Sequence, residues 1–154
     1  MTIEDDISFF ERVPTLSRLG RQALRILAIG AENRYVHGGE VLYNAGAEAD
    51  GGFVIQEGRF LLSSPEDGQE VTVGPYTLLG EAALYTGTTR ATTATALEPS
   101  TVLHIPRPLF LKMLESFPDA ARQLREILAS RVDQSTREID GVRAILDAHE
   151  SESK

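Results

Sequence analysis

The 154-residue chain contains no cysteine, no tryptophan and only two lysines, Lys112 and Lys154. The absence of cysteine excludes a disulfide framework and a thiolate zinc site, and it fits a reducing compartment. No apolar run is long enough to span a membrane, and the acidic opening of the chain differs from a basic secretory leader. Together with a length typical of one hydrophobic core, these absences predict a single cytoplasmic domain with no membrane partner.

Basic residues are scarce, with 15 Lys and Arg against 23 Asp and Glu, so the formal net charge is −8. Binding to duplex nucleic acid depends on clustered Lys and Arg, and we therefore expect no DNA binding by this chain. Histidine is also rare, being limited to His37, His104 and His149 without a His-x-His pair. A cupin-type metalloenzyme, which needs several histidines and a carboxylate around one metal, is accordingly a weak alternative, and no metal site is expected.

The spacing of apolar residues divides the chain into three parts within one domain, residues 1–154. Residues 34–105 form short apolar stretches separated by Gly, Pro, Asn and Asp, as is typical of an antiparallel roll or barrel. Apolar residues at helical spacing predict a short helix from Phe9, a break at Pro14 and a second helix after it. Helical spacing is found again beyond residue 105, where Pro118 begins a long final helix. The predicted fold is mainly β with flanking helices (α+β): an antiparallel β-roll between N-terminal helices (1–33) and C-terminal helices (106–148).

The long final helix carries a possible dimer interface. Its apolar residues recur at spacings of four and three, which predicts a coiled-coil seam with Ser135 as the one polar member. In a parallel homodimer Glu138 would attract Arg143 of the partner, whereas the alternative is a helix that lies on its own domain. The seam consists of Leu128, Val132, Ser135, Ile139, Val142 and Leu146.

One stretch of the chain has the composition of an anion-binding loop. Gly80 allows close approach of the backbone, and the short helix expected after it offers unpaired N–H groups at Gly80, Ala82 and Ala83. Arg90 follows a Gly/Thr loop and can clamp the same anion with its planar fork of donors. Glu81 would repel a phosphate, so its expected role is to accept hydrogen bonds from a sugar hydroxyl. This combination indicates a nucleotide whose phosphate is joined to its own sugar.

Residues 80–84 (Gly-Glu-Ala-Ala-Leu) and 89–92 (Thr-Arg-Ala-Thr) resemble the phosphate-binding cassette of cyclic nucleotide-binding domains. The resemblance extends to the hairpin of residues 37–46 and to the strand and turn of residues 53–58, and it covers about residues 9–145. It implies a β-roll that binds cAMP or cGMP without altering it, hence a protein that is not an enzyme. It is close to the sensor half of catabolite-activator-type transcription factors, and the helix-turn-helix of those proteins is not expected in this chain.

The resemblance also suggests residues that recognise the base. Ala91 stands where cGMP-selective relatives often carry threonine. The alanine at this position therefore favours cAMP over cGMP. Ser135 and Thr136 fall on the polar pair that contacts the adenine amino group in catabolite-activator-type proteins, although a serine bonded to its own helix carbonyl is an equal alternative for Ser135. From their alternation on one predicted strand, Val71 and Val73 are candidates to line the sugar and base pocket, with ordinary core residues as the alternative. The expected ligand-binding residues are Gly80, Glu81, Ala82, Ala83, Arg90, Ala91, Val71, Val73, Ser135 and Thr136.

The sequence therefore predicts a stand-alone regulatory sensor for signal transduction. The ligand would order the cassette, defined as residues 78–92, and reposition the C-terminal helix, which an unidentified downstream protein would read. No cofactor other than the cyclic nucleotide is expected. A competing hypothesis is a structural or dimerisation module that has the same fold and has lost the ligand.

Overall fold

The computed structural model describes residues 2–130, so Ser135, Thr136 and all of the predicted seam except Leu128 lie outside the described residues. Alongside the numbered elements it contains a helix over residues 118–130, with Pro118 at its first position. The numbered elements are α1 (Ile3–Phe10), α2 (Arg21–Gly30), β1 (Glu32–Val36), β2 (Val41–Tyr43), β3 (Glu48–Ala49), β4 (Gly51–Glu57), β5 (Phe60–Ser63), β6 (Glu70–Val73), β7 (Leu78–Leu79), the 3₁₀ helix η1 (Glu81–Leu84), β8 (Thr88–Thr89), β9 (Thr93–Ala96), β10 (Ser100–Pro106) and α3 (Arg107–Ser116).

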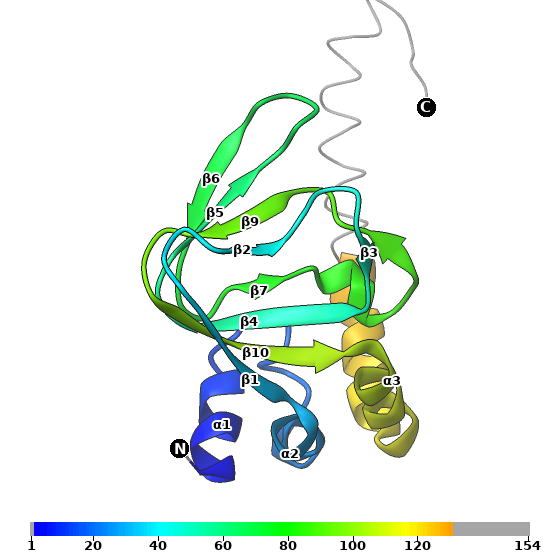
Figure 1. Cartoon of the computed structure of the whole chain (residues 1–154). Helices are drawn as coiled ribbons and strands as arrows, with labels where there is room; N and C mark the ends of the chain where they lie inside the picture. The colour runs from blue at the N-terminus through cyan, green and yellow to red at the C-terminus, as the bar shows by residue number, and fades with distance from the viewer. Residues whose placement is uncertain (1, 131–154) are drawn as a thin grey trace, which may run out of the picture.

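The strands form an antiparallel roll of two facing sheets (Figure 1). One sheet has the order β1-β10-β4-β7 and the other β2-β9-β5-β6, while β3 pairs with β8 beside the cassette. The β5–β6 hairpin projects from the roll. The predicted α+β roll with flanking helices is confirmed. Its strands begin at Glu32 rather than at residue 34, because the exposed polar residues at the start of β1 carry no apolar signal.

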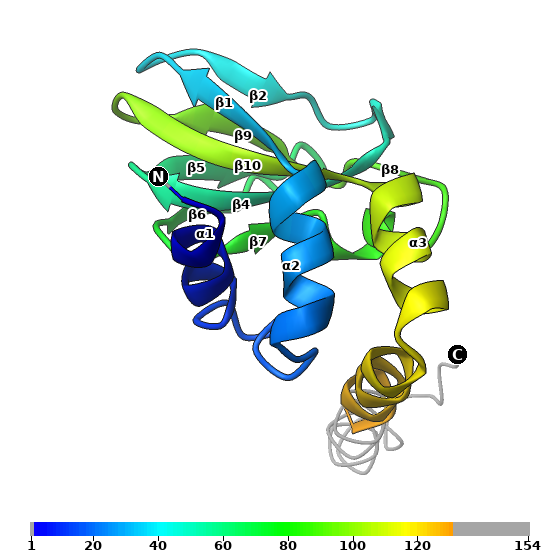
Figure 2. The same ribbon diagram turned by 90° about the horizontal axis from the view of Figure 1, so that it is seen from below.

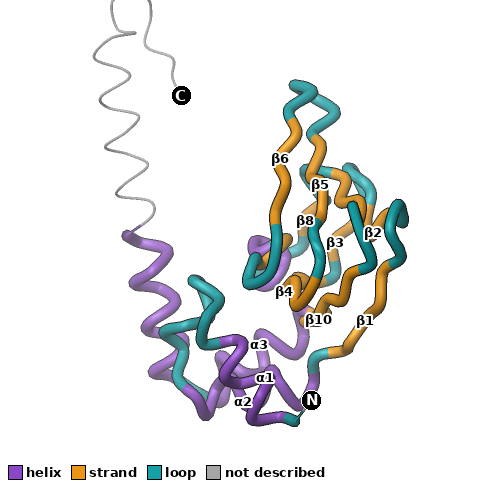
Figure 3. The backbone as a smooth tube through the Cα atoms, turned by 90° about the vertical axis from the view of Figure 1, so that its left-hand side faces the viewer, coloured by secondary structure: helices purple, strands orange, loops and turns teal. Residues whose placement is uncertain are grey.

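Sheet β1-β10-β4-β7 is covered on both faces, which explains the continuous burial of β4 from Gly51 to Gln56. Alternate residues of a strand point to opposite faces. Val54 therefore packs under the helices, whereas Phe53 and Ile55 belong to the cluster between the two sheets. Figures 2 and 3 show α1, α2 and α3 gathered on the outer face of this sheet.

The first helix begins six residues earlier than the apolar spacing around Phe9 indicates, since α1 starts at Ile3. The start is fixed by a capping box in which the Asp5 amide donates to Thr2 Oγ1 at 3.1 Å and the Thr2 amide donates to Asp5 Oδ2 at 3.2 Å. Acidic side chains in the first turn also suit the positive end of a helix. Capping rather than apolar periodicity thus determines this boundary.

The C-terminal helices rest on the core beneath the roll. Ala120 and Leu124 of the helix over residues 118–130 are buried there, and Leu128 is partly buried against the same cluster. Leu128, the first residue of the predicted seam, therefore contacts its own domain in this structure. No helix within residues 2–130 is both long and apolar enough to cross a membrane.

Candidate functional site

The cassette folds around a small cavity. Between β7 and β9 the chain turns through η1 and the short strand β8, and this path brings the six cassette residues predicted from the sequence to one place. The cavity has a volume of about 300 Å³. Its lining consists of Gly80, Glu81, Ala82, Ala83, Arg90 and Ala91 together with Tyr43, Ala49, Thr88, Thr89 and Thr92.

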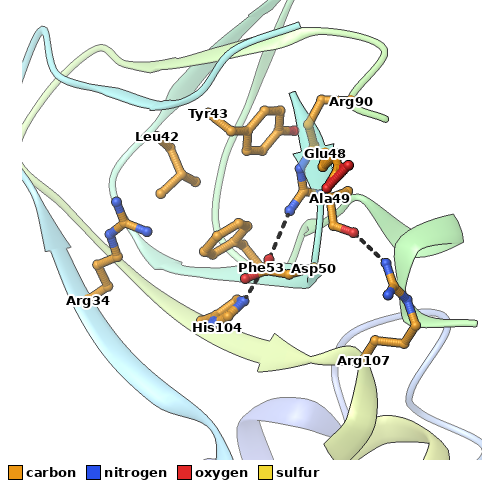
Figure 4. Close-up of a pocket in the computed structure, with 10 residues that line it drawn as sticks. All are labelled: Arg34, Leu42, Tyr43, Glu48, Ala49, Asp50, Phe53, Arg90, His104 and Arg107. Carbon is orange, nitrogen blue, oxygen red and sulfur yellow. Dashed lines mark hydrogen bonds and ion pairs between the residues drawn. The ribbon is translucent and has the colours of Figure 1, made fainter. Parts of the chain in front are cut away.

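Arg90 is the central cation of the site, and its side chain is only 5% exposed. Its Nη2 lies 3.7 Å from Oδ1 of Asp50, and its guanidinium carbon lies 4.5 Å from the ring centroid of Tyr43 and 5.4 Å from that of Phe53 (Figure 4). Within residues 2–130, Nε and Nη1 are buried without a hydrogen-bond partner. Desolvation lowers the pKa of Arg90 below its ordinary value. A buried guanidinium of this kind is stabilised most by an anion that accepts hydrogen bonds from these two nitrogens.

Gly80 is required for Arg90 to lie where it does. Its φ of 74° falls in the left-handed region, which residues with a Cβ rarely adopt. A Cβ added at this position would also overlap Nη1 of Arg90. The group that this glycine approaches in the structure is the guanidinium of Arg90, and the close approach to a ligand stays a prediction.

The carboxylate of Glu81 is held by two hydroxyl groups. Thr15 donates from Oγ1 to Oε1 at 2.8 Å, and the phenol of Tyr85 donates to Oε2 at 2.6 Å. Thr15 belongs to the connection between α1 and α2, so the carboxylate expected to bind ribose is tied to the N-terminal helices. The contact with a sugar hydroxyl itself stays a prediction.

The backbone amides of η1 are partly used within the turn. The Ala83 amide donates to the Gly80 carbonyl at 3.0 Å, and the Ala82 carbonyl accepts from the amides of Tyr85 and Thr86, each at 3.2 Å. A phosphate contact through Ala83 would have to replace this hydrogen bond. The predicted contacts through Gly80, Ala82 and Ala83 therefore remain predictions.

The two valines of β6 lie apart from the described cavities. Val71 is 55% exposed and pairs with Leu62 in the β5–β6 register, whereas Val73 packs against the cluster between the sheets. Neither lines a cavity described for residues 2–130. Alternation placed them correctly on one face of a strand, but it carries no information on how much of that face is covered.

A second cavity of about 430 Å³ adjoins the first and shares Tyr43, Ala49 and Arg90 with it (Figure 4). Its aromatic wall includes Phe53, on which the ring of His104 stacks at 4.7 Å between centroids. The lining residues are Arg34, Leu42, Tyr43, Glu48, Ala49, Asp50, Phe53, Arg90, His104 and Arg107. Residues 2–130 contain no group of three or more His, Cys, Asp or Glu side chains arranged to hold a metal ion.

Arg107 is a site residue that sequence reasoning missed. It is the first residue of α3, and its Nε donates to the Ala83 carbonyl at 2.9 Å while Nη2 donates to the carbonyl of Ala49. One guanidinium thus joins the cassette, β3 and the start of α3. The only sequence signal was its position directly after the last apolar strand, and this position alone does not indicate which carbonyls the side chain reaches.

Comparison with known proteins agrees with the resemblance to cyclic nucleotide-binding domains that the sequence shows. A sequence model described as the cyclic nucleotide-binding domain matches residues 33–117, more than half of the chain. A cyclic nucleotide-binding-like protein from Brucella abortus is 37% identical with a TM-score of 0.63, over 72% of this chain and 98% of that protein. The N-terminal domain of a transcriptional regulator from Streptomyces coelicolor is 26% identical with a TM-score of 0.76, over 85% of this chain and 94% of that domain.

The chain is also similar to part of a longer curated protein. It is 28% identical over 123 residues to an uncharacterised NTE family protein of Mycobacterium bovis, a match that covers 80% of this chain and 21% of that protein. The chain therefore spans about a fifth of the length of such relatives. By its sequence and its fold, the chain belongs to the cyclic nucleotide-binding domain family.

Proposed function

We propose that this domain binds a cyclic nucleotide at the cassette and that Arg90 supplies the main contact to the phosphate. The observation that carries the proposal is the buried guanidinium at the cassette cavity, two of whose nitrogens find no hydrogen-bond partner in the described part of the chain, residues 2–130. A cyclic phosphate has one negative charge shared by two exocyclic oxygens, which can accept together from the fork of an arginine. The bound phosphate would offset the cost of desolvating Arg90.

The other cassette groups fit the sugar part of such a ligand. Glu81 borders the same cavity as Arg90, so a nucleotide whose phosphate is closed onto its own ribose can reach both side chains. Gly80 keeps the space beside Nη1 of Arg90 free of side-chain atoms. The ligand is bound without chemical change in this proposal.

We propose cAMP as the favoured ligand, with cGMP as the alternative. The basis is Ala91, which lies exposed at the cassette cavity and has no hydroxyl to offer a guanine amino group. Base contacts by Ser135 and Thr136 are predictions from the sequence alone. Calorimetric titration of the full chain with cAMP, cGMP and linear 5′-AMP tests the proposal. Saturable binding of cAMP that is tighter than that of the other two supports it, and no binding of either cyclic nucleotide refutes it in favour of a structural module.

We further propose a regulatory role in which the C-terminal helices transmit ligand binding to an unidentified partner protein. The support is the hydrogen bond from Arg107 to the Ala83 carbonyl, which links the first residue of α3 to η1, and the packing of α3 against η1. Any reorganisation of η1 by a phosphate would therefore act directly on α3. Hydrogen exchange of residues 107–130 with and without cAMP measures this link, and unchanged protection at saturating ligand would contradict it.

A further inference from the structure

Thr15 reaches the cassette from a distant part of the chain. Its Oγ1 donates to Oε1 of Glu81 at 2.8 Å, across 66 positions of sequence, and the residue is only 4% exposed. A hydrogen bond to a carboxylate is among the stronger kinds in proteins. Because Thr15 is buried and Glu81 is partly buried, the contact is stronger than a similar one at the surface.

The connection that carries Thr15 is firmly held. Val13 and Leu16 on either side are fully buried in the core beneath the helices. The turn is closed by the amide of Leu16, which donates to the Val13 carbonyl at 2.9 Å, and by the amide of Ser17, which donates to the same carbonyl at 2.8 Å. The hydroxyl of Thr15 is therefore presented to Glu81 from a fixed position.

Tyr85 holds the other oxygen of the carboxylate. Its hydroxyl donates to Oε2 of Glu81 at 2.6 Å, and its ring packs edge-on against the fully buried ring of Phe110 at 5.9 Å between centroids. Phe110 belongs to α3, so this second donor is supported by the C-terminal side of the domain. Each oxygen of Glu81 is thus fixed by a hydroxyl whose own backbone or ring is packed.

We propose that Thr15 and Tyr85 are positioning residues that preset the carboxylate of Glu81 for the ribose 2′-hydroxyl. The inference rests on the proposed function. A glutamate has several rotamers, and ordering it before the ligand arrives removes that entropic cost from binding. A carboxylate has about four lone-pair positions, so accepting from two hydroxyls does not prevent it from accepting from a third. Recognition of the sugar in this chain then depends on the connection between α1 and α2.

The test uses full-chain variants that differ by single hydroxyl groups. Thr15→Val removes the hydroxyl at nearly constant volume, Thr15→Ser keeps it, and Tyr85→Phe removes the second donor while keeping the ring on Phe110. Each variant is titrated with cAMP and with 2′-deoxy-cAMP. We expect Thr15→Val and Tyr85→Phe to weaken cAMP binding about tenfold, equivalent to ~1.4 kcal/mol. Binding of 2′-deoxy-cAMP should change little, and Thr15→Ser should keep the wild-type preference for the 2′-hydroxyl.

Every other outcome overturns the inference in an identifiable way. Equal losses for both ligands would show that Thr15 only supports the fold, and tighter cAMP binding by Thr15→Val would show that its hydroxyl competes with the ribose. Wild-type protein that binds neither ligand refutes the proposed function and this inference with it, whereas wild-type binding with an unaltered Thr15→Val refutes the inference alone. Thermal unfolding without ligand checks each fold, and Tyr85→Phe carries the test if Thr15→Val fails to fold.

Discussion

Gly80 and Arg90 are in such close contact that a Cβ at Gly80 would overlap Nη1 of the arginine. The two residues are ten positions apart in the chain, and the turn through η1 and β8 brings them together. The positive φ of Gly80 directs the chain into η1, and its missing side chain makes room for the guanidinium. One glycine therefore serves both the backbone path and the position of the cation.

Replacement of Gly80 should weaken ligand binding as well as lower stability. Gly80→Ala places a residue with a Cβ at a φ of 74°, at a cost of about 1–2 kcal/mol, and pushes Arg90 away from its position. We expect cAMP affinity measured by calorimetry to fall at least about tenfold. Gly68→Ala is the matched control, because Gly68 has a φ of 70° and a Cβ there would meet no atom within 4 Å. Comparable affinity losses in both variants would contradict the role of Gly80 at the site.

Removal of the buried cation Arg90 should abolish ligand binding without destabilising the fold. Arg90→Met fills a similar volume and eliminates two buried donors that have no partner within residues 2–130. The ligand-free melting temperature should stay the same or rise, since an unsatisfied buried polar group costs about 1–3 kcal/mol. Cyclic nucleotide binding should be abolished in calorimetry. Unchanged cAMP affinity in this variant would remove Arg90 from the phosphate contact.

Replacement of Arg107 should be destabilising even when the new residue is lysine. Its guanidinium donates to the carbonyls of Ala83 and Ala49 at once, a geometry that a single ammonium group cannot reproduce. Arg107→Lys should lower the free energy of unfolding in urea by about 1–3 kcal/mol, and it should weaken cAMP binding through displacement of η1. Arg59→Lys, at an exposed ion pair with Glu98, is the control and should be nearly silent. Similar behaviour of the two variants would show that the double contact has no special importance.

Asp6 should make the fold less stable at neutral than at mildly acidic pH. Burial of its carboxyl group, whose Oδ1 lacks a partner within residues 2–130, raises its pKa above the ordinary value. The folded state then binds the proton more tightly than the unfolded state, so this contribution to stability grows as the pH falls through the raised pKa.

The matching variant is Asp6→Asn, which has no charge to bury. It should raise the melting temperature at pH 7, and the gain should shrink as the pH falls through the raised pKa of the wild-type carboxyl group. Glu66→Gln, in an exposed loop, is the control for loss of one negative charge. A gain for Asp6→Asn that is independent of pH would show that the desolvated charge is not its cause.

The seam predicted from the sequence leads to an expectation about assembly. If it pairs two chains, the full-length protein should sediment as a homodimer at micromolar concentration. Combined Ile139→Asp and Val142→Asp substitutions should yield a folded monomer, because like charges facing each other in an interface cost several kcal/mol. Wild-type protein that sediments as a monomer with cAMP bound would contradict the seam and the proposed adenine contact of Ser135.

The sequence by itself determined the fold class and the cassette. Both follow from local order: turn residues at regular intervals predict an antiparallel roll, and a glycine, a carboxylate and an arginine in fixed succession indicate an anion-binding loop. The order of Gly80, Glu81 and Arg90 predicts that the three residues share one site, and in the structure all three line one cavity.

Only the tertiary structure decided which distant groups surround these residues. Thr15 meets Glu81 because the connection between α1 and α2 packs beneath the cassette, and Arg107 reaches the Ala83 carbonyl because α3 follows β10 back towards η1. Alternation placed Val71 on the same face as Val73, but exposure of the edge strand left it at the surface. Periodicity reports only the neighbours along the chain, whereas partners across the fold are selected by packing, and no local pattern encodes them.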